Sequence, residues 1–305
     1  IGKALILRTA SFGFVENLVR KSFLFRPLVK RFIAGDTLEQ ALLQAELLCD
    51  KGLLATLDNL GENTKTPEEA NSAAATYCRM LERIAQSKHA PKITISIKLT
   101  QCGFDIGDEF CEQNYRNVLA EAAKFGNSVC VDMESSDYTE RTLQMMERVF
   151  PDMPNTGTVL QSYLRRSIDD TKRMIKLGCS IRVVKGAYLE PATVAFEDKK
   201  DVDRVYVEMC HMLLRDGNNP AIATHDEKIV NQILDFVKRE KIDPKSFEFQ
   251  MLYGIRRDLQ DRLAKDGYNV RIYVPYGDSW YPYFTRRLAE RPANSLFILK
   301  SLFKG

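Results

Sequence analysis

The stretch LATLDNLGE, residues 54–62, decides between two α/β folds for this chain. The apolar run at residues 53–57 is typical of a buried strand, and the loop DNLGE follows it directly. An open, doubly wound sheet that binds nucleotides normally places a glycine-rich GxGxxG loop at this point. Residues 58–62 lack that signature, so the stretch favours a closed barrel. It also places two carboxylates, Asp58 and Glu62, behind the first strand.

The same unit, an apolar run followed by a helical pattern, repeats along the chain. The predicted strands are 53–57, 93–99, 128–133, 157–161, 180–184, 221–224, 247–252 and 270–274. The predicted helices are 67–88, 111–125, 138–149, 167–177, 201–214, 226–240, 255–265 and 280–290. Strands that are apolar on both faces are buried on both faces, as in a parallel sheet. Eight such units predict a TIM-like (β/α)8 barrel.

Local signals mark the ends of several predicted helices. The sequence TPEE at residues 66–69 indicates a helix start, with proline in the first turn and carboxylates near the positive end of the helix dipole. Gly126, Gly178 and Gly217 stand where helices commonly end on a left-handed residue. We therefore expect a positive φ at all three glycines.

Composition excludes several classes of protein. The formal charge of +3 and the absence of a basic tract argue against nucleic-acid binding. The seven cysteines form no CxxC pair and fall mostly in apolar runs, which predicts reduced core thiols and a cytoplasmic protein. Three scattered histidines predict no metal site.

The ends of the chain leave a question open. No signal peptide or bilayer-spanning stretch is visible, and the first residue is Ile1, so we expect trimmed ends. Residues 12–33 mix aromatic and basic side chains. They fit a helix that caps the domain, or a basic amphipathic pair on a membrane surface, and the same two uses apply to residues 296–299.

Polar residues stand at the carboxyl end of every predicted strand, where barrel enzymes collect their chemistry. They are Asp58, Glu62, Lys98, Asp132, Glu134, Gln161, Arg182, Lys185, Thr224, His225, Asp226, Gln250 and Tyr273. The set includes three cations, Lys98, Arg182 and Lys185, and within it no serine or cysteine stands beside the histidine. Such a site suits anionic ligands and redox chemistry by an organic cofactor. A Schiff-base lyase using Lys98 or Lys185 and a non-catalytic sensor remain alternatives.

The last predicted helix carries adjacent arginines, Arg286 and Arg287. Two guanidiniums near the mouth of a barrel form a fork for a carboxylate or phosphate, although a solvated basic helix face would look the same. Successive helical residues point about 100° apart, so either both side chains bend toward one ligand or only one contacts it. Glu290 has the spacing to hold either guanidinium.

Five long motifs resemble the proline dehydrogenase family. They are LQSYLRRS (160–167), IRVVKGAYLE (181–190), ATHDE (223–227), FEFQML (247–252) and RIYVPYG…YFTRRLAERPAN (271–294). The resemblance extends to LATLDNLGE, SIKL (96–99) and VDME (131–134), and the length is similar to that of bacterial monofunctional members. It implies a distorted barrel whose last helix lies over the mouth. It also implies FAD-dependent oxidation of L-proline to Δ1-pyrroline-5-carboxylate, the first step of proline catabolism, with electrons passed to a membrane quinone.

The resemblance also implies roles for particular residues. Asp132 and Arg182 match active-site positions, with Arg182 close to the flavin N5. Lys98, Arg286, Arg287, Tyr273, Leu252 and Tyr188 match the substrate pocket. Met133, Gln161, Arg182, Lys185, Gly186, Ala187, Thr224 and His225 match flavin-binding positions. Glu62 matches an acidic gate that closes by pairing with Arg286. The one departure is Leu189, where relatives often have tryptophan.

For the whole chain we therefore expect one catalytic domain. Residues 1–50 would form leading helices, 51–292 the barrel and 293–305 a tail. Expected partners are L-proline and a quinone, with peripheral contact at the cytoplasmic face of the inner membrane as an open alternative. The sequence does not predict an oligomeric state.

Overall fold

The computed structural model describes residues 26–289 and contains a closed barrel of eight parallel strands. The strands are β1 Leu54–Asn59, β2 Ile93–Ile97, β3 Val129–Val131, β4 Thr156–Gln161, β5 Ser180–Val184, β6 Ala221–Ala223, β7 Glu248–Leu252 and β8 Asn269–Tyr276. Each strand pairs with the next, and β1 pairs with β8 to close the ring. The predicted (β/α)8 barrel is confirmed.

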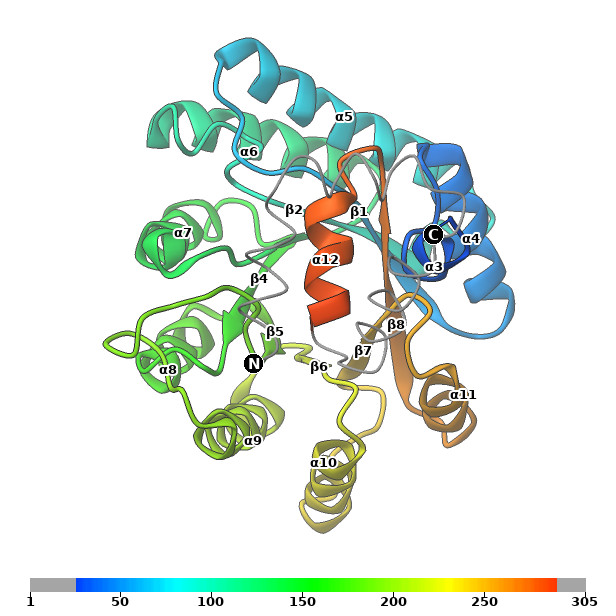
Figure 1. Cartoon of the computed structure of the whole chain (residues 1–305), viewed down its shortest axis with the longest axis vertical. Helices are drawn as coiled ribbons and strands as arrows, with labels where there is room; N and C mark the ends of the chain where they lie inside the picture. The colour runs from blue at the N-terminus through cyan, green and yellow to red at the C-terminus, as the bar shows by residue number, and fades with distance from the viewer. Residues whose placement is uncertain (1–25, 290–305) are drawn as a thin grey trace, which may run out of the picture.

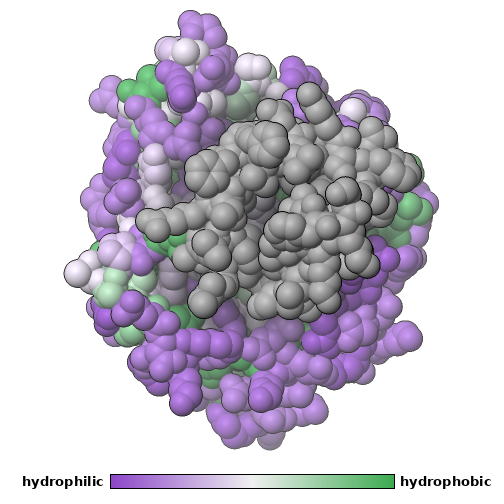
Figure 2. All heavy atoms as spheres, in the orientation of Figure 1, coloured by the Kyte–Doolittle hydropathy of each residue, from purple (hydrophilic) through white to green (hydrophobic). Residues whose placement is uncertain are grey.

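A ring of helices surrounds the barrel (Figure 1). They are α5 Pro67–Ala85, α6 Asp108–Lys124, α7 Ser136–Val149, α8 Ser167–Leu177, α9 Lys199–Asp216, α10 Glu227–Arg239 and α11 Arg257–Lys265, with α4 Leu38–Asp50 before β1. A short 3-10 turn, η2 Ala90–Lys92, leads into β2. The apolar faces of the helices pack on the strands in one continuous core. Their outer faces are largely hydrophilic in the view of Figure 2.

The predicted helix ends were correct at three places and wrong at one. Thr66 caps α5, accepting a hydrogen bond from the Glu69 N–H, and Pro67 is the first helical residue. Gly178 and Gly126 have φ of 84° and 60°, as expected. Gly217 instead has φ −86° at the end of α9. A Cβ at this position would lie 2.6 Å from the Leu213 carbonyl oxygen. The lack of space for a side chain therefore explains why glycine stands here.

The last described helix, α12 Tyr281–Ala289, lies across the barrel mouth in Figure 1, as predicted. It is anchored by an aromatic cluster that includes Phe284, Tyr281 and Phe32 at the end of α3 Arg26–Phe32. The rings of Phe32 and Phe284 lie 6.4 Å apart between centroids. The end of the leading region thus packs under α12, which agrees with the capping use. Residues 12–25, Glu290 and the predicted tail lie outside the described residues.

Two predictions from composition can also be compared with the structure. All seven cysteines are free thiols, and five of them are buried. Between residues 26 and 289, no helix has both the length and the apolar character needed to cross a bilayer.

Candidate active site

A cavity of about 710 Å³ opens at the carboxyl ends of the strands, beneath α12. All eight strands or the residues directly after them contribute to its wall. Every residue to which the family resemblance gives a role lines it: Glu62, Lys98, Asp132, Met133, Gln161, Arg182, Lys185, Gly186, Ala187, Tyr188, Thr224, His225, Leu252, Tyr273, Arg286 and Arg287. Its volume lies in the range of ordinary small-molecule and cofactor sites.

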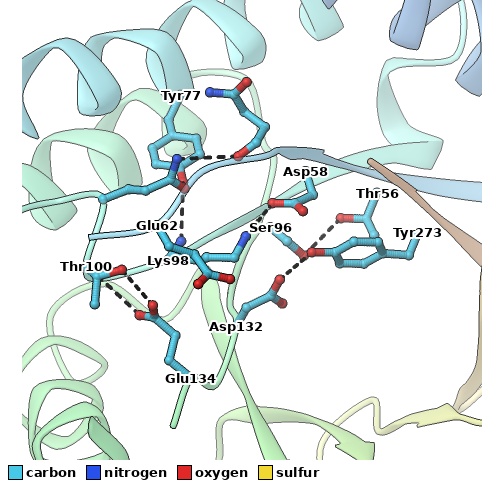
Figure 3. Close-up of polar contacts among 12 residues, drawn as sticks. Thr56, Asp58, Glu62, Tyr77, Ser96, Lys98, Thr100, Asp132, Glu134 and Tyr273 are labelled. Carbon is cyan, nitrogen blue, oxygen red and sulfur yellow. Dashed lines mark hydrogen bonds and ion pairs between the residues drawn. The ribbon is translucent and has the colours of Figure 1, made fainter. Parts of the chain in front are cut away.

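Asp132, Arg182 and Tyr273 form one bonded group in the cavity wall. Arg182 donates to Asp132 over 2.6 Å and to the Ser96 hydroxyl over 2.9 Å. The Tyr273 hydroxyl donates to the other oxygen of Asp132 over 2.5 Å, a contact visible in Figure 3. Burial, followed by the charge of Asp132, raises the pKa of Tyr273, so its hydroxyl keeps the proton that it donates. The group holds the Arg182 guanidinium in one orientation.

Several buried polar atoms of residues that line the cavity have no partner among the described residues. They include Arg182 Nε, a donor, and the acceptors Gln161 Oε1, Asp58 Oδ2 and Gln250 Oε1. The Gln161 amide nitrogen, in contrast, donates to the Glu134 carbonyl over 3.2 Å. Buried polar groups are normally hydrogen-bonded, so unsatisfied groups beside a cavity indicate a polar ligand.

Lys98 forms a buried ion pair with Asp58 over 2.9 Å. Burial alone would lower the pKa of Lys98, but the carboxylates of Asp58 and Asp132 outweigh it and raise the pKa above its ordinary value. Lys98 is therefore charged at neutral pH. A protonated amine cannot attack a carbonyl, so this geometry argues against a Schiff-base lyase using Lys98.

The other candidate lysine is also held by carboxylates. Lys185 Nζ lies 2.6 Å from Asp203 Oδ1 and 3.2 Å from Asp226 Oδ2. Asp226 also caps α10 by accepting from the Lys228 N–H, so the structural role considered for it exists beside its place in the cavity wall. These two contacts hold the Lys185 side chain in place in the cavity wall.

His225 and Gly186 also line the cavity. His225 Nε2 accepts from the Leu252 N–H over 2.9 Å, which ties the loop after β6 to the end of β7. Gly186 has φ of 113°, a region that side chains rarely adopt. A Cβ there would lie 2.3 Å from the ring of Tyr163. Glycine thus allows the backbone to run close beside that ring.

The two arginines of α12 both line the cavity but have different surroundings. Arg286 is paired with Glu62 over 2.9 Å, and its guanidinium carbon lies 5.6 Å from the centre of the Tyr188 ring. The corresponding Arg287 atom lies 5.1 Å from the centre of the Tyr283 ring. Both can therefore reach one ligand in the cavity, while Arg286 also connects α12 to the loop after β1.

Glu134 is a buried carboxyl beside this site. The Thr100 hydroxyl donates to it over 2.6 Å, and the Thr100 N–H donates over 3.3 Å (Figure 3). Burial dominates over these bonds and over the charge of Lys98, and it raises the pKa of Glu134 from 4.5 to about 7. Glu134 does not line the cavity.

We expect this carboxyl to make stability depend on pH. The folded protein holds the Glu134 proton more tightly than the unfolded chain, so the associated stability is present below pH 4.5 and is lost as pH rises through about 7. The full change is on the order of 3 kcal/mol. Glu134→Gln should lack this dependence. Unfolding in urea from pH 4.5 to 8 checks it, and equal pH slopes in both proteins would contradict the expectation.

Sequence reasoning missed several residues that build the site. Asp203 lies near the start of α9, and its spacing of four from Lys199 was its one visible signal. Thr100 belongs to a loop, and Tyr77 looks like an ordinary core residue of α5. Yet the Tyr77 hydroxyl accepts from the Lys98 N–H, which helps to hold the lysine. Tyr283 was not singled out within the last motif.

Comparisons with known proteins agree on one family. The family model described as proline dehydrogenase matches residues 41–300. Proline dehydrogenase 1 of Bacillus subtilis subsp. natto is 42% identical over 275 residues, which are 90% of each chain. Proline dehydrogenase of Deinococcus radiodurans is 40% identical over 303 residues, covering 98% of this chain and 97% of that protein.

Solved structures give the same fold. Proline utilization A (PutA) from Bdellovibrio bacteriovorus, inactivated by N-propargylglycine, superposes with a TM-score of 0.81 at 24% identity. The match covers 87% of this chain but 33% of that one, so this chain spans about a third of its length. At this identity the likeness supports the barrel alone. The family model and the curated relatives go further: the chain belongs to the proline dehydrogenase family, oxidoreductases of proline catabolism.

Proposed function

We propose that this protein oxidises L-proline to Δ1-pyrroline-5-carboxylate with FAD held in the cavity under α12. Family membership supports the substrate and the reaction. The binding of FAD and proline in this cavity is supported by its lining, which combines a cluster of cations under α12 with unsatisfied polar atoms. We propose further that the catalytic barrel corresponds to residues 51–292.

The residues of the wall fit a flavin. A flavin ring presents both hydrogen-bond donors and acceptors, which match the unpaired Arg182 Nε and Gln161 Oε1. Gly186 also lines the cavity, and it brings the backbone of this segment close against the Tyr163 ring. We assign the remaining flavin contacts to Met133, Lys185, Ala187, Thr224 and His225, which all line the same cavity. FAD, when bound, supplies the two-electron acceptor that takes a hydride at its N5.

The proline carboxylate is assigned to the cationic end of the cavity. Arg286, Arg287 and Lys98 are positioned there, and an arginine can bind a carboxylate through two parallel hydrogen bonds. Tyr273, Leu252 and Tyr188 provide walls for the apolar ring of the substrate. Fixing the carboxylate at one end orients the carbon next to nitrogen at the other, which is most of what such a small substrate requires.

Glu62, Asp132 and Arg182 complete the assignment. Glu62 closes the mouth by pairing with Arg286. Asp132 holds Arg182 and Tyr273 in place, and Arg182 brings a fixed positive charge to the wall where electrons arrive. The substrate amine must be neutral when hydride leaves. Lys98 is already charged and cannot take its proton, so we assign this proton to water or to deprotonation before binding.

The electron acceptor is proposed to be a quinone, reached by peripheral contact of a cytoplasmic protein with the inner membrane. This part is supported by the resemblance to the family. It is tested by following the reduction of a soluble quinone analogue by L-proline, with and without anionic vesicles.

Steady-state turnover tests the proposed reaction. Purified protein supplied with FAD, L-proline and an artificial electron acceptor should form a product that reacts as a cyclic imine. Turnover by protein that contains no bound flavin and receives no added flavin would contradict the assignment of FAD as the cofactor. Irreversible trapping of a carbonyl substrate by borohydride would instead favour the Schiff-base lyase.

Tyr273→Phe should change substrate selectivity more than flavin retention. The change removes the hydroxyl that donates to Asp132 while keeping the ring that faces Arg182 at 5.4 Å. A looser wall should admit 4-hydroxyproline more readily, so the ratio of kcat/KM for proline and 4-hydroxyproline should fall by roughly 5-fold, the value of one hydrogen bond. An unchanged ratio would remove Tyr273 from the substrate pocket.

A further inference from the structure

We propose that Glu134 and Thr100 act together as positioning residues for the gate formed by Glu62 and Arg286. This inference rests on the proposed function, because it concerns how the site closes over its substrate. Neither residue lines the cavity, so neither is expected to touch proline or flavin.

The anchor of this arrangement is completely buried. Thr100 is 0% exposed and Glu134 is 5% exposed. Two hydrogen bonds join them, from the Thr100 hydroxyl and from its N–H, one to each carboxyl oxygen of Glu134. Figure 3 shows this contact beside Lys98 and below Glu62. A side chain held by both of its oxygens offers one fixed position for the loop that follows β2.

Thr100 in turn holds the two residues that follow the gate carboxylate. Its hydroxyl accepts from the Asn63 N–H over 3.2 Å. Its carbonyl accepts from the Thr64 N–H over 3.2 Å and from the Thr64 hydroxyl over 2.8 Å. Thr100 therefore connects a buried carboxyl to the gate segment, residues 62–64, through three hydrogen bonds.

The backbone turns sharply at Asn63, beside the gate carboxylate. Asn63 has φ of 52°, a left-handed conformation that asparagine adopts more readily than most residues with a side chain. Its amide side chain also donates to Asp105 over 2.8 Å and to the Tyr138 hydroxyl over 3.1 Å. The turn at Asn63 sets the direction in which Glu62 leaves the chain, toward Arg286 at 2.9 Å.

Loosening this support should shift the gate toward its open state. A gate that is closed less of the time binds proline more weakly, while the chemical step within the closed complex is unchanged. The expected signature is a rise in KM for L-proline with nearly constant kcat. A general loss of folding would instead reduce the amount of active enzyme and leave KM unaffected.

Thr100→Val tests the inference, with Thr100→Ser as its matched control. Valine keeps the shape but removes the hydroxyl that joins Glu134 to Asn63, whereas serine keeps it. We expect KM to rise roughly 5-fold in the valine variant, the value of a hydrogen bond, and to stay near the original value with serine. Glu134→Gln, which can still accept one bond, should raise KM less than Glu134→Ala.

Thr139→Val controls for the removal of a buried hydroxyl from a residue that does not line the cavity. The Thr139 hydroxyl is buried in α7 and has no partner in the described part of the chain. This variant should therefore leave KM unchanged. Thermal unfolding of each variant shows whether it is folded under the assay conditions.

The decisive comparison repeats Thr100→Val in a Glu62→Ala background. If Thr100 acts through the gate, its effect on KM should vanish once the gate carboxylate is gone. An equal rise in KM in both backgrounds, or none in the original background, would overturn the inference. Failure of the unaltered protein to oxidise proline would instead contradict the proposed function.

Discussion

Arg286→Met is expected to lower kcat/KM for L-proline by roughly 100-fold, about 3 kcal/mol of lost transition-state stabilisation. Arg286 is half-buried beneath the mouth, where a charge-assisted pair with the substrate carboxylate is only partly screened by water. The change also leaves Glu62 without its partner at 2.9 Å, so the gate fails as well. Methionine fills similar volume without the charge, which separates electrostatics from packing.

Steady-state kinetics with L-proline measure this effect. Two other variants show whether the effect is specific to the arginines of α12. Arg287→Met should cost a similar amount in proline binding but should not open the gate, because it leaves the ion pair between Arg286 and Glu62 in place. Arg204→Met on the outer face of α9 should cost almost nothing, since its ion pairs are exposed. Near-normal kcat/KM in both α12 variants would remove the carboxylate assignment.

Gly186→Ala is expected to cause the largest combined loss of stability and flavin binding. A side chain at φ of 113° costs about 1–3 kcal/mol in backbone strain alone. Its Cβ would also lie 2.3 Å from the Tyr163 ring, whose hydroxyl is bonded to Glu190 over 3.4 Å. Either that ring or the loop carrying Ala187 and Tyr188 must move. Both movements alter the wall assigned to the flavin.

Gly178→Ala separates the effect of backbone strain from the effect of steric contact with Tyr163. Gly178 also has a positive φ, 84°, but a Cβ there would meet nothing within 4 Å. We expect it to destabilise the fold by about 1–2 kcal/mol and to leave flavin content intact. Bound flavin per chain and the free energy of unfolding measure the two effects. Equal losses in both variants would show that the close approach at Gly186 has no special role.

The strand ends were the most predictable part of the site. In a parallel barrel every strand delivers its carboxyl end to the same rim, so Asp58, Lys98, Asp132 and Arg182 could be grouped before any contact was known. The match of each predicted strand to an observed one depended on apolar runs bounded by polar residues. The positions of the strands can therefore be predicted from the hydrophobic pattern along the chain.

Contacts that cross from helix to strand were not predictable in the same way. Asp203 reaches Lys185 from near the start of α9, and Tyr77 reaches Lys98 from the buried face of α5. Helical periodicity states which face is inward, but it does not state which strand end that face meets. The prediction of a positive φ at Gly217 was wrong for a related reason. Glycine is selected both by a positive φ and by close packing, here on Leu213.

The geometry of the α12 arginines required the folded chain. Adjacent residues on a helix diverge, and the sequence left open whether both side chains meet one ligand. Both line the same cavity, and Glu62, 224 residues away in sequence, reaches Arg286. Such a contact depends on where β1 and α12 lie in the closed barrel.

The central claim is that this barrel binds FAD and reduces it with L-proline. The most direct measurement is the visible absorption spectrum of the purified protein, recorded without oxygen before and after adding L-proline. We expect a flavin spectrum that bleaches on addition of L-proline and not of D-proline. A flavin spectrum unchanged by L-proline, or a protein that takes up no FAD, would contradict the account.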